Sequence, residues 1–293
     1  MANTQQAWIE TLQRESGIRR AIILHGDILD VYQSPRTKSD YVPIQPIVCT
    51  TLRSKGFSDI ILWDTFEGVK NITPERWQAL QKDMVSSANQ SPSNSGDATA
   101  YDMGDVSLEE PQQTAQGITP PNIDDFLPIV HYYLTHQTVS RIAFILDWSQ
   151  YLFTSNASLS EEDRKRLLML SKSINNAPLA FKNKEEMNMP GNMLVLITSK
   201  LENIPSVFYQ GNVCVKDIPV SGPSRIEREA FLDKEMDKWN LSKNPMFSKS
   251  QFADFVDATD GFSIRDLIQL ARLSQQMQSP PLSAEKIINL YRY

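Results

Sequence analysis

Residues 21–32 read AIILHGDILDVY, and this short stretch determines the fold expected for the whole chain. An apolar run leads into Gly26, and two acidic residues, Asp27 and Asp30, follow the glycine. A continuous apolar run that ends in glycine is typical of a buried strand and its turn in a parallel α/β sheet. The stretch therefore predicts the first strand of such a sheet, and it raises the question of why the turn after it is acidic.

Apolar runs and helix signals alternate along the rest of the chain. Runs of strand length lie at 21–25, 59–63, 141–146, 193–197 and 213–218. Helix starts are indicated between them by Pro46, Thr73-Pro74, Asn122 and Ser160. From about residue 224 only helix signals remain, at Ser224, Ser250, Ser263 and Ser283. This alternation predicts an α/β fold with a five-stranded parallel sheet covered on both faces, followed by a small all-helical domain.

These patterns divide the chain into four parts and one insert. The expected parts are an N-terminal helix in 1–17, the α/β domain in 18–222, the helical domain in 223–278 and a further helix or linker in 279–293. Residues 86–122 are rich in Ser, Gln, Asn, Pro and Gly and poor in large apolar residues. Because such a segment cannot bury enough apolar surface to offset its ordering entropy, we expect a disordered loop inserted in the α/β domain.

The acidity of the chain is concentrated in one region. The formal net charge is −6, yet no Lys or Arg lies between Lys82 and Arg141. The acidic residues in that interval are Asp83, Asp97, Asp102, Asp105, Glu109, Glu110, Asp124 and Asp125. The rest of the chain is close to neutral and has no cluster of basic residues, so no nucleic-acid surface is expected.

Neither a membrane nor a secretory destination is indicated. No apolar run approaches the roughly 18 residues that a membrane helix needs, and the N-terminus is polar and then amphipathic. Cys49 and Cys214 fall in a predicted helix and a predicted strand, and we expect both to be buried free thiols. We therefore expect a cytoplasmic protein without a zinc site, because Cys and His are few and lie at no ligand-like spacing.

The sequence contains no phosphate-binding loop. The pattern GxxxxGK[ST] needs a lysine after its last glycine, and none of the 11 glycines is followed by lysine. Asp27 and Asp30 would instead oppose a polyphosphate, since two like charges about 4 Å apart repel by roughly 4 kcal/mol at an effective dielectric constant of about 20. Helix capping explains the two aspartates without a ligand, with Asp27 as N-cap and Asp30 in the first turn of a following helix.

The other predicted strands also end in polar residues, and ligands of open α/β sheets bind at these ends. Asp64 follows the second strand, Asp147 the third, and Thr198 and Ser199 the fourth. The third strand, RIAFILDWSQYL, has the form of a Walker B strand, whose aspartate would hold Mg²⁺. Trp148 stands where an active ATPase carries the glutamate that activates the attacking water.

Two further motifs follow the strand endings, and the order of all these motifs along the chain matches that of a known family. Pro223, Arg225 and Arg228 form a P…R…R stretch, and ATDGFSIRDL at 258–267 contains a TxGFSxRDL signature. Together with the strand endings, these motifs resemble an AAA+ module over about residues 18–278. The resemblance implies a sheet of the P-loop NTPase type and a helical lid. It also implies remnants of a nucleotide pocket at Gly26, Asp147, Thr198, Ser199 and, in the sensor-2 position, Arg265.

Within AAA+ proteins, the turn LHGDILD at 24–30 resembles the degenerate N-terminal module of bacterial two-module, disaggregase-like ATPases. The segment IPSVFYQGN at 204–212 also lacks the arginine that would act as a finger for a neighbouring subunit. The resemblance implies a non-hydrolysing module with no catalytic residues, no metal site and at most vestigial binding of ATP and Mg²⁺. Its implied role is assembly or regulation of a ring-type AAA+ ATPase, in a homo- or hetero-oligomer with other AAA+ modules or subunits. Residues 279–293 would then lead to a second module.

Two alternatives stay open on the sequence alone. A Mg²⁺-dependent phosphohydrolase or nuclease would use Asp27, Asp30, Asp64 and Asp147, because clustered carboxylates bind hard cations. The chain has no nucleophile motif of the form DxDx[TV] to support it. An inactive clamp-loader-type subunit would share the AAA+ fold, but it predicts a basic surface that the composition does not provide.

The predicted insert gives a first test. Deletion of residues 86–122 is expected to change the melting temperature by no more than a few degrees, because these residues supply no core side chains. Limited proteolysis of the full chain is expected to cut first within the same segment. A larger fall in melting temperature on deletion would mean that the segment is packed.

Overall fold

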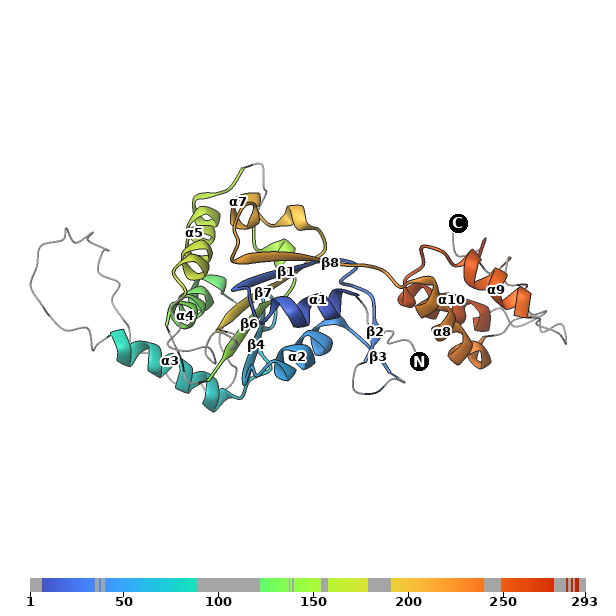
Figure 1. The fold of residues 1–293 in the computed structure, drawn as a ribbon, viewed down its shortest axis with the longest axis horizontal. Helices are drawn as coiled ribbons and strands as arrows, with labels where there is room; N and C mark the ends of the chain where they lie inside the picture. The colour runs from blue at the N-terminus through green and yellow to red at the C-terminus, as the bar shows by residue number, and fades with distance from the viewer. Residues whose placement is uncertain are drawn as a thin grey trace, which may run out of the picture.

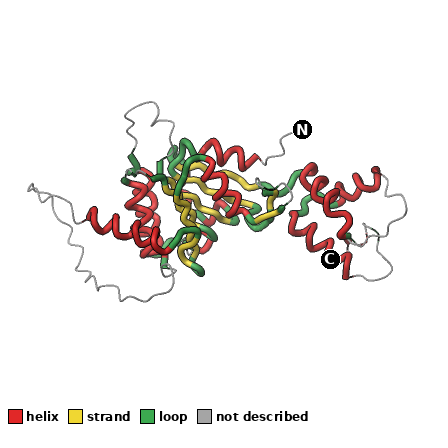
Figure 2. Tube along the Cα trace, turned by 90° about the horizontal axis from the view of Figure 1, so that it is seen from below, coloured by secondary structure: helices red, strands yellow, loops and turns green. Residues whose placement is uncertain are grey.

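The computed structural model describes residues 7–34, 37, 40–88, 122–136, 138, 140–153, 158–178, 191–239 and 249–276, together with 283, 286, 288 and 289. A central sheet lies between two layers of helices, and a further group of helices lies beyond the end of the last strand (Figure 1). Figure 2 shows the same arrangement along the chain trace, with the strands enclosed by helices. The predicted α/β class is therefore confirmed. Within the described ranges, no helix has the length and apolar character needed to cross a membrane.

The sheet has six strands, so the prediction of five was wrong. Its strands are β1 (Ala21–Gly26), β4 (Asp59–Asp64), β5 (Gly68–Lys70), β6 (Ile142–Leu146), β7 (Met193–Thr198) and β8 (Val215–Val220), in the order β5-β4-β6-β7-β1-β8. Five strands are parallel and correspond to the five predicted runs, whereas β5 pairs antiparallel with β4. Because β5 has three residues and begins with glycine, it offers no apolar run by which a sequence pattern could identify it.

The sheet is buried on both faces, because successive strand residues point to opposite sides. Among the described residues, the longer helices that cover it are α1 (Ala7–Glu15), α2 (Ile44–Ser54), α3 (Pro74–Ala88), α4 (Ile123–Thr135) and α5 (Glu161–Asn175). The face that carries Ile23 and Phe144 packs against α3, α4 and α5. The face that carries Ile22 and Ile145 packs against α1 and α2. The continuous apolar runs in the sequence follow from this double burial.

Several predicted helix starts are confirmed by their capping bonds. The side chain of Asn122 accepts a hydrogen bond from the Asp124 N–H at 3.0 Å. Ser160 forms a reciprocal capping box with Asp163, and Ser224 caps the first helix of the C-terminal group in the same way. These caps form within four residues of chain, so local sequence is enough to predict them.

The helix predicted directly after β1 does not exist. Residues 27–31 form turns that lead into an antiparallel hairpin of β2 (Tyr32–Gln33) and β3 (Tyr41–Val42). The helix α2 begins only after this hairpin. The interpretation of Asp27 and Asp30 as caps of a following helix is therefore wrong.

The C-terminal group of helices has its own hydrophobic core. It comprises α8 (Arg225–Glu235), α9 (Lys249–Ala258) and α10 (Ile264–Gln276). Leu232, Phe255 and Leu267 are among the buried residues of this core. We call α8, α9 and α10 the helical region.

The β2–β3 hairpin connects the sheet domain to the helical region. Val31, just before β2, is part of the core of the helical region. Tyr41 of β3 packs edge-on against Phe231 of α8, with ring centroids 5.0 Å apart. The ammonium group of Lys234 also lies 5.7 Å from the centre of the Tyr41 ring, close enough for a cation–π contact. The insertion between β1 and α2 therefore fastens one part of the molecule to the other.

Most of the predicted insert 86–122 and of the C-terminal segment 279–293 lies outside the described residues. The described helix α3 extends to Ala88, and Asn122 caps α4, so both ends of the predicted insert belong to helices. Within the C-terminal segment, Ile288 is buried in the core of the helical region.

Both cysteines are free, as predicted. Cys49 is buried in α2, and burial raises the pKa of its thiol to about 11. Cys214 is only partly buried and lies one residue before β8 rather than within it. A thiol with a raised pKa is a poor nucleophile at neutral pH, so Cys49 serves packing.

The aromatic cluster around Phe126 gives a test of the core. Its ring stacks on Trp63 and Trp77 at centroid distances of 5.6 and 6.0 Å and meets Phe144 edge-on. Phe126→Ala is expected to lower the free energy of unfolding by about 3–5 kcal/mol, because it leaves a cavity in the core. Phe66→Ala is the control: Phe66 is 89% exposed, and its loss should change that free energy by less than about 0.5 kcal/mol. Urea denaturation measures both, and an equal loss in the two variants would contradict the described core.

Candidate functional site

Gly26 ends β1 where three strand ends come close together, and the backbone there requires glycine. Its φ is +113°, and a Cβ atom would lie 2.6 Å from the carbonyl oxygen of Val220 in β8. Its N–H donates to the carbonyl oxygen of Ser199 at 3.2 Å. Gly26 therefore permits a close approach between strands, and its N–H is already used within the protein.

The carboxylate of Asp30 is bound at the N-terminus of α10. Its Oδ2 accepts a hydrogen bond from the Ile264 N–H at 2.9 Å, and its Oδ1 accepts one from the Arg265 N–H at 2.8 Å. The next N–H, that of Asp266, donates to the hydroxyl of Ser263 at 3.0 Å. A helix N-terminus attracts anions through its unpaired N–H groups and its dipole. Asp30 thus fills the anion position of a helix that lies 234 residues further along the chain.

The charges in the loop after β1, which we call the first loop (residues 27–43), oppose the binding of phosphate. Asp30 is only 1% exposed. Burial raises the pKa of its carboxyl, although the N–H donors of Ile264 and Arg265 act in the opposite direction. Burial also raises the pKa of Asp27, and the neighbouring Asp30 adds to that shift. A polyphosphate would bring more negative charge to two carboxyl groups whose ionised forms are already disfavoured.

The helix after the first loop provides no cradle for phosphate groups. Residues 27–43 contain no glycine. In the first turn of α2, Ile44 is buried in the core and Pro46 has no N–H to offer. The side chain of Gln45 in the same turn donates through Nε2 to Oδ2 of Asp147 at 2.8 Å. The start of α2 is therefore packed against the chain itself.

Both carboxylate oxygens of Asp147 have partners within the protein. Oδ2 accepts from Gln45, and Oδ1 accepts from the N–H of Trp148 at 2.9 Å. Burial raises the pKa of Asp147, and the hydrogen bond from Gln45 acts against that shift. Trp148 itself lies in the left-handed region, with φ 51° and ψ 38°, and its ring stacks on Tyr151. The Walker-B-like aspartate therefore supports the turn after β6.

Asp64 supports the turn between β4 and β5 in a similar way. Its Oδ1 accepts hydrogen bonds from the N–H groups of Phe66 and Glu67 at 2.8 and 2.7 Å. The ammonium group of Lys70 lies 2.6 Å from its Oδ2. Burial alone would raise the pKa of Asp64, but Lys70 and the two N–H donors lower it. This pattern is typical of an aspartate that fixes a turn.

The hydroxyl groups at the end of β7 are also occupied locally. Asn203, at the end of the short helix η2 (Leu201–Asn203), donates through Nδ2 to the hydroxyl oxygens of Thr198 and Ser199 at 3.3 and 3.2 Å. The Thr198 hydroxyl donates in turn to the carbonyl oxygen of Lys200 at 3.2 Å. These groups stabilise the turn after β7.

The arginines of the helical region differ in their roles. Arg228 is buried, and it donates to the carbonyl oxygen of Pro223 at 3.0 Å and to Asp260 at 2.7 Å. It thereby joins the start of α8 to the turn before α10. Arg265 offers its backbone N–H to Asp30, while its side chain is exposed and forms no ion pair with any described residue.

The predicted pocket residues therefore fall into three groups. These are Gly26 with Thr198 and Ser199, Asp147 with Gln45, and Arg265 with Asp30. In the part of the chain that the structure describes, no group of three or more His, Cys, Asp or Glu side chains could hold a metal ion. No local sequence pattern predicts the roles of Gln45 and Asp30, because their hydrogen-bond partners lie 102 and 234 residues away along the chain.

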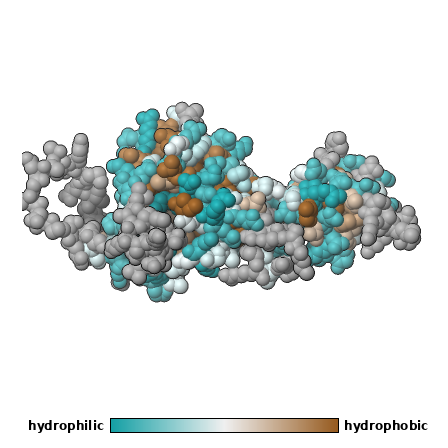
Figure 3. Space-filling view, in the orientation of Figure 1, coloured by the Kyte–Doolittle hydropathy of each residue, from teal (hydrophilic) through white to brown (hydrophobic). Residues whose placement is uncertain are grey.

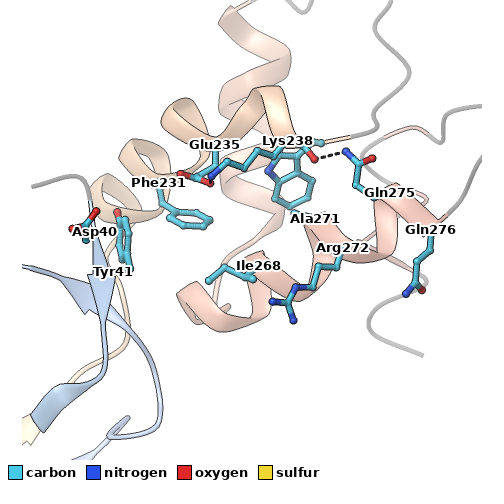
Figure 4. Close-up of a pocket in the computed structure, with 11 residues that line it drawn as sticks. Asp40, Tyr41, Phe231, Glu235, Lys238, Ile268, Ala271, Arg272, Gln275 and Gln276 are labelled. Atoms are coloured by element: carbon cyan, nitrogen blue, oxygen red, sulfur yellow. Dashed lines mark hydrogen bonds and ion pairs between the residues drawn. The ribbon is translucent and has the colours of Figure 1, made fainter.

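A cavity of about 790 Å³ lies elsewhere, between the hairpin and the helical region (Figure 4). Phe231 of α8 and Ile268 and Ala271 of α10 provide apolar walls, and Tyr41 of the hairpin lies at one end. Charged and amide side chains, among them Arg272, complete the lining. None of the predicted pocket residues lines this cavity.

Comparison with known proteins assigns the sheet domain. The family described as "AAA+ chaperone, N-terminal Rossmann-like domain" matches residues 4–221, a range that runs from α1 to the end of β8. No curated protein matches the chain. Among solved structures, a chain of the "Structure of E. coli MS115-1 HORMA:CdnC:Trip13 complex" is similar, with 13% sequence identity and a TM-score of 0.46. That match covers 94% of this chain and 73% of the other.

The bond between Asp30 and α10 can be tested with a matched pair of variants. Asp30→Asn presents an amide nitrogen to backbone N–H donors, so one of them loses its acceptor. We expect the free energy of unfolding to fall by about 1–3 kcal/mol. Hydrogen exchange of the Ile264 and Arg265 amides should accelerate, as measured by NMR. Asp27→Asn is the control, because the Asp27 side chain is only partly buried and is not bonded to α10. Unchanged exchange at both amides in Asp30→Asn would contradict the described contact.

Proposed function

The chain belongs to the family of AAA+ chaperone N-terminal Rossmann-like domains, and from this we propose that it is a degenerate AAA+ module that does not hydrolyse ATP. Its role is the assembly or regulation of a ring-type AAA+ ATPase. The observation that carries the proposal is the Asp30 carboxylate at the N-terminus of α10. A group of the chain itself holds the helical region on the sheet domain there, so the contact needs no bound nucleotide.

The first loop supports the proposal because it lacks each feature by which a phosphate loop works. Such a loop presents N–H groups from a glycine-rich turn and a lysine to the phosphates. Here the Gly26 N–H is bonded to Ser199, the residues up to α2 contain no glycine, and two carboxyl groups stand in the turn. Binding of a nucleoside triphosphate would break the hydrogen bond between Gly26 and Ser199, and it would bring the negatively charged phosphates close to two carboxyl groups.

The end of β6 supports the absence of hydrolysis independently. Activation of water needs a group that accepts a proton. The indole of Trp148, in the position of the expected glutamate, is only a hydrogen-bond donor. The neighbouring Asp147 already accepts from Gln45 and from the Trp148 N–H. Neither Asp147 nor Trp148 is therefore free to activate an attacking water at the end of β6.

The finer part of the proposal concerns the parent protein. The turn LHGDILD resembles that of the N-terminal module in bacterial two-module, disaggregase-like ATPases. We therefore propose that the helical region acts as a lid-like connector, and that residues 279–293 lead to a second, catalytic module. The proposed partners are other AAA+ modules or subunits, and the proposed location is the cytoplasm.

Nucleotide turnover tests the proposal directly. Purified wild-type protein and Asp147→Asn are expected to release phosphate from ATP no faster than buffer, because the described part of the loop after β1 forms no phosphate cradle and Trp148 stands in place of the base. The melting temperature is expected to stay constant as ATP and Mg²⁺ are added. Turnover by the wild type that Asp147→Asn abolishes would overturn the proposal.

Titration with Mg²⁺ or Mn²⁺ alone separates the proposal from a metal-dependent phosphohydrolase. A cation shared by the strand-end aspartates would stabilise the wild type by about 2.7 kcal/mol at a hundredfold excess over its dissociation constant. We expect no saturable rise in melting temperature, in the wild type or in Asp27→Asn/Asp147→Asn. A rise in the wild type that vanishes in the double variant would favour the phosphohydrolase.

A further inference from the structure

The cavity between the hairpin and the helical region has the size and position of a site for a small organic molecule. Its volume is about 790 Å³, and ligand pockets commonly measure about 300–1,000 Å³ and lie between domains. Its walls come from Tyr41 of β3, from the segment between Phe231 and Trp239, and from α10. On the face of the molecule shown in Figure 3, hydrophobic residues form only small patches on a largely hydrophilic surface, so few other places on that face suit an apolar ligand.

The apolar part of the lining comes from facing sides of α8 and α10. Ile268 and Ala271 are three residues apart and therefore lie on one side of α10. Figure 4 shows Phe231 pointing from α8 toward Ile268. Because Ala271 carries only a methyl group, space remains between the two helices at this level. A ligand with an apolar body would bury that body against these side chains.

The walls of the cavity are held in place by contacts within the protein. The ring of Trp239 packs edge-on against Phe255 of α9, with ring centroids 5.4 Å apart. The side-chain amide of Gln275 donates to the carbonyl oxygen of Lys238, which joins α10 to the segment after α8 (Figure 4). A site formed in advance loses little freedom when a ligand binds, so more of the contact energy contributes to affinity.

The two positive charges of the lining differ in their partners. Lys238 forms an ion pair with Glu235 within the same wall. Arg272 is exposed and forms no ion pair with any described residue. It follows Ile268 by four residues, and Figure 4 shows its guanidinium group beside that apolar side chain. A guanidinium group matches a carboxylate in charge and in the geometry of its N–H donors, so this part of the cavity favours a carboxylate next to an apolar body.

The hairpin end of the cavity offers no positive charge for a ligand. Asp40 is acidic and accepts a hydrogen bond from the hydroxyl of Thr37 at 2.8 Å. Burial raises the pKa of Tyr41 to about 12, and Glu227 and Glu235 add to the shift, so the Tyr41 hydroxyl is neutral at pH 7. A negatively charged group of a ligand is therefore repelled from this end and directed toward Arg272.

We propose that this cavity binds a small amphiphilic carboxylate, with its alkyl or aromatic body between α8 and α10 and its carboxylate on Arg272. Such a ligand contacts the hairpin at Tyr41 and the helical region at both helices, so its binding stabilises the junction between them by mass action. The site is separate from the strand ends. The inference therefore goes beyond the proposed function and does not depend on it.

NMR titration of the full chain with octanoate and with 1-octanol at pH 7 tests the site. The two probes have alkyl chains of the same length, and only octanoate is charged. We expect both to cause saturable shifts of the Ile268 and Ala271 amide signals, and octanoate to bind the wild type at least about tenfold more tightly. Arg272→Gln should bind the two probes about equally. Arg265→Gln is the matched control and should keep the preference, because Arg265 is also exposed on α10 but does not line the cavity.

Ala271→Leu tests the apolar wall independently of charge. Its larger side chain fills space between the two helices, so both probes are expected to bind at least about tenfold more weakly. Circular dichroism and the melting temperature verify that each variant is folded. If Ala271→Leu does not fold, the comparison of Arg272→Gln with Arg265→Gln still decides, because both replace exposed side chains.

Several outcomes would overturn the inference. These are the absence of saturable shifts at Ile268 and Ala271, equal shifts at remote exposed residues such as Phe66, or an unchanged preference for octanoate in Arg272→Gln. An acidic amphipathic peptide that shifts the two signals where octanoate does not would also overturn it, and would identify a groove for protein instead. None of these results bears on the proposed function, which nucleotide turnover and the response to metal test separately.

Discussion

The arrangement of this molecule depends on one buried carboxylate, that of Asp30, and on the helix end that binds it. An ionised carboxylate without partners in the protein interior is unfavourable by several kcal/mol. The first N–H groups of α10 are likewise costly to bury without acceptors. Each group satisfies the other through two hydrogen bonds, at 2.9 and 2.8 Å. The loop after β1 and the start of α10 are therefore held together, and the hairpin residues Val31 and Tyr41 add apolar contacts to the same junction.

The same principle explains the other strand ends. The carboxyl edge of a parallel sheet gathers N–H groups and polar side chains, and these need partners from a ligand or from the chain. In this protein the chain supplies them: Gln45 for Asp147, Lys70 for Asp64, and Asn203 for Thr198 and Ser199. Residue types that bind nucleotide or metal in other proteins support turns here. Their presence at strand ends is therefore weak evidence for a ligand unless their hydrogen bonds are known.

How much of the structure the sequence predicts depends on how far apart along the chain the interacting residues lie. The five parallel strands and the caps at Asn122 and Ser160 depend on continuous burial or on bonds within four residues, and both were predicted correctly. β5 was missed because three residues beginning with glycine form no pattern. The sequence correctly suggests that Asp30 lies at the N-terminus of a helix, but the helix is α10 and not one directly after β1. The residues after β1 are equally compatible with a local cap, and only the folded chain brings α10 to them.

The contact made by Asp30 also limits how this module can be regulated. A ligand shifts a conformational equilibrium only by the difference in its affinity for the two states. A nucleotide would have to displace a carboxylate that is tethered in place, and such an intramolecular group competes at a high effective concentration. On the proposed function, a nucleotide would therefore have little influence over the position of the helical region. On the same proposal, a signal that moves the helical region would have to act on the contacts that hold it, which are the two hydrogen bonds of Asp30 and the packing of Tyr41 on Phe231.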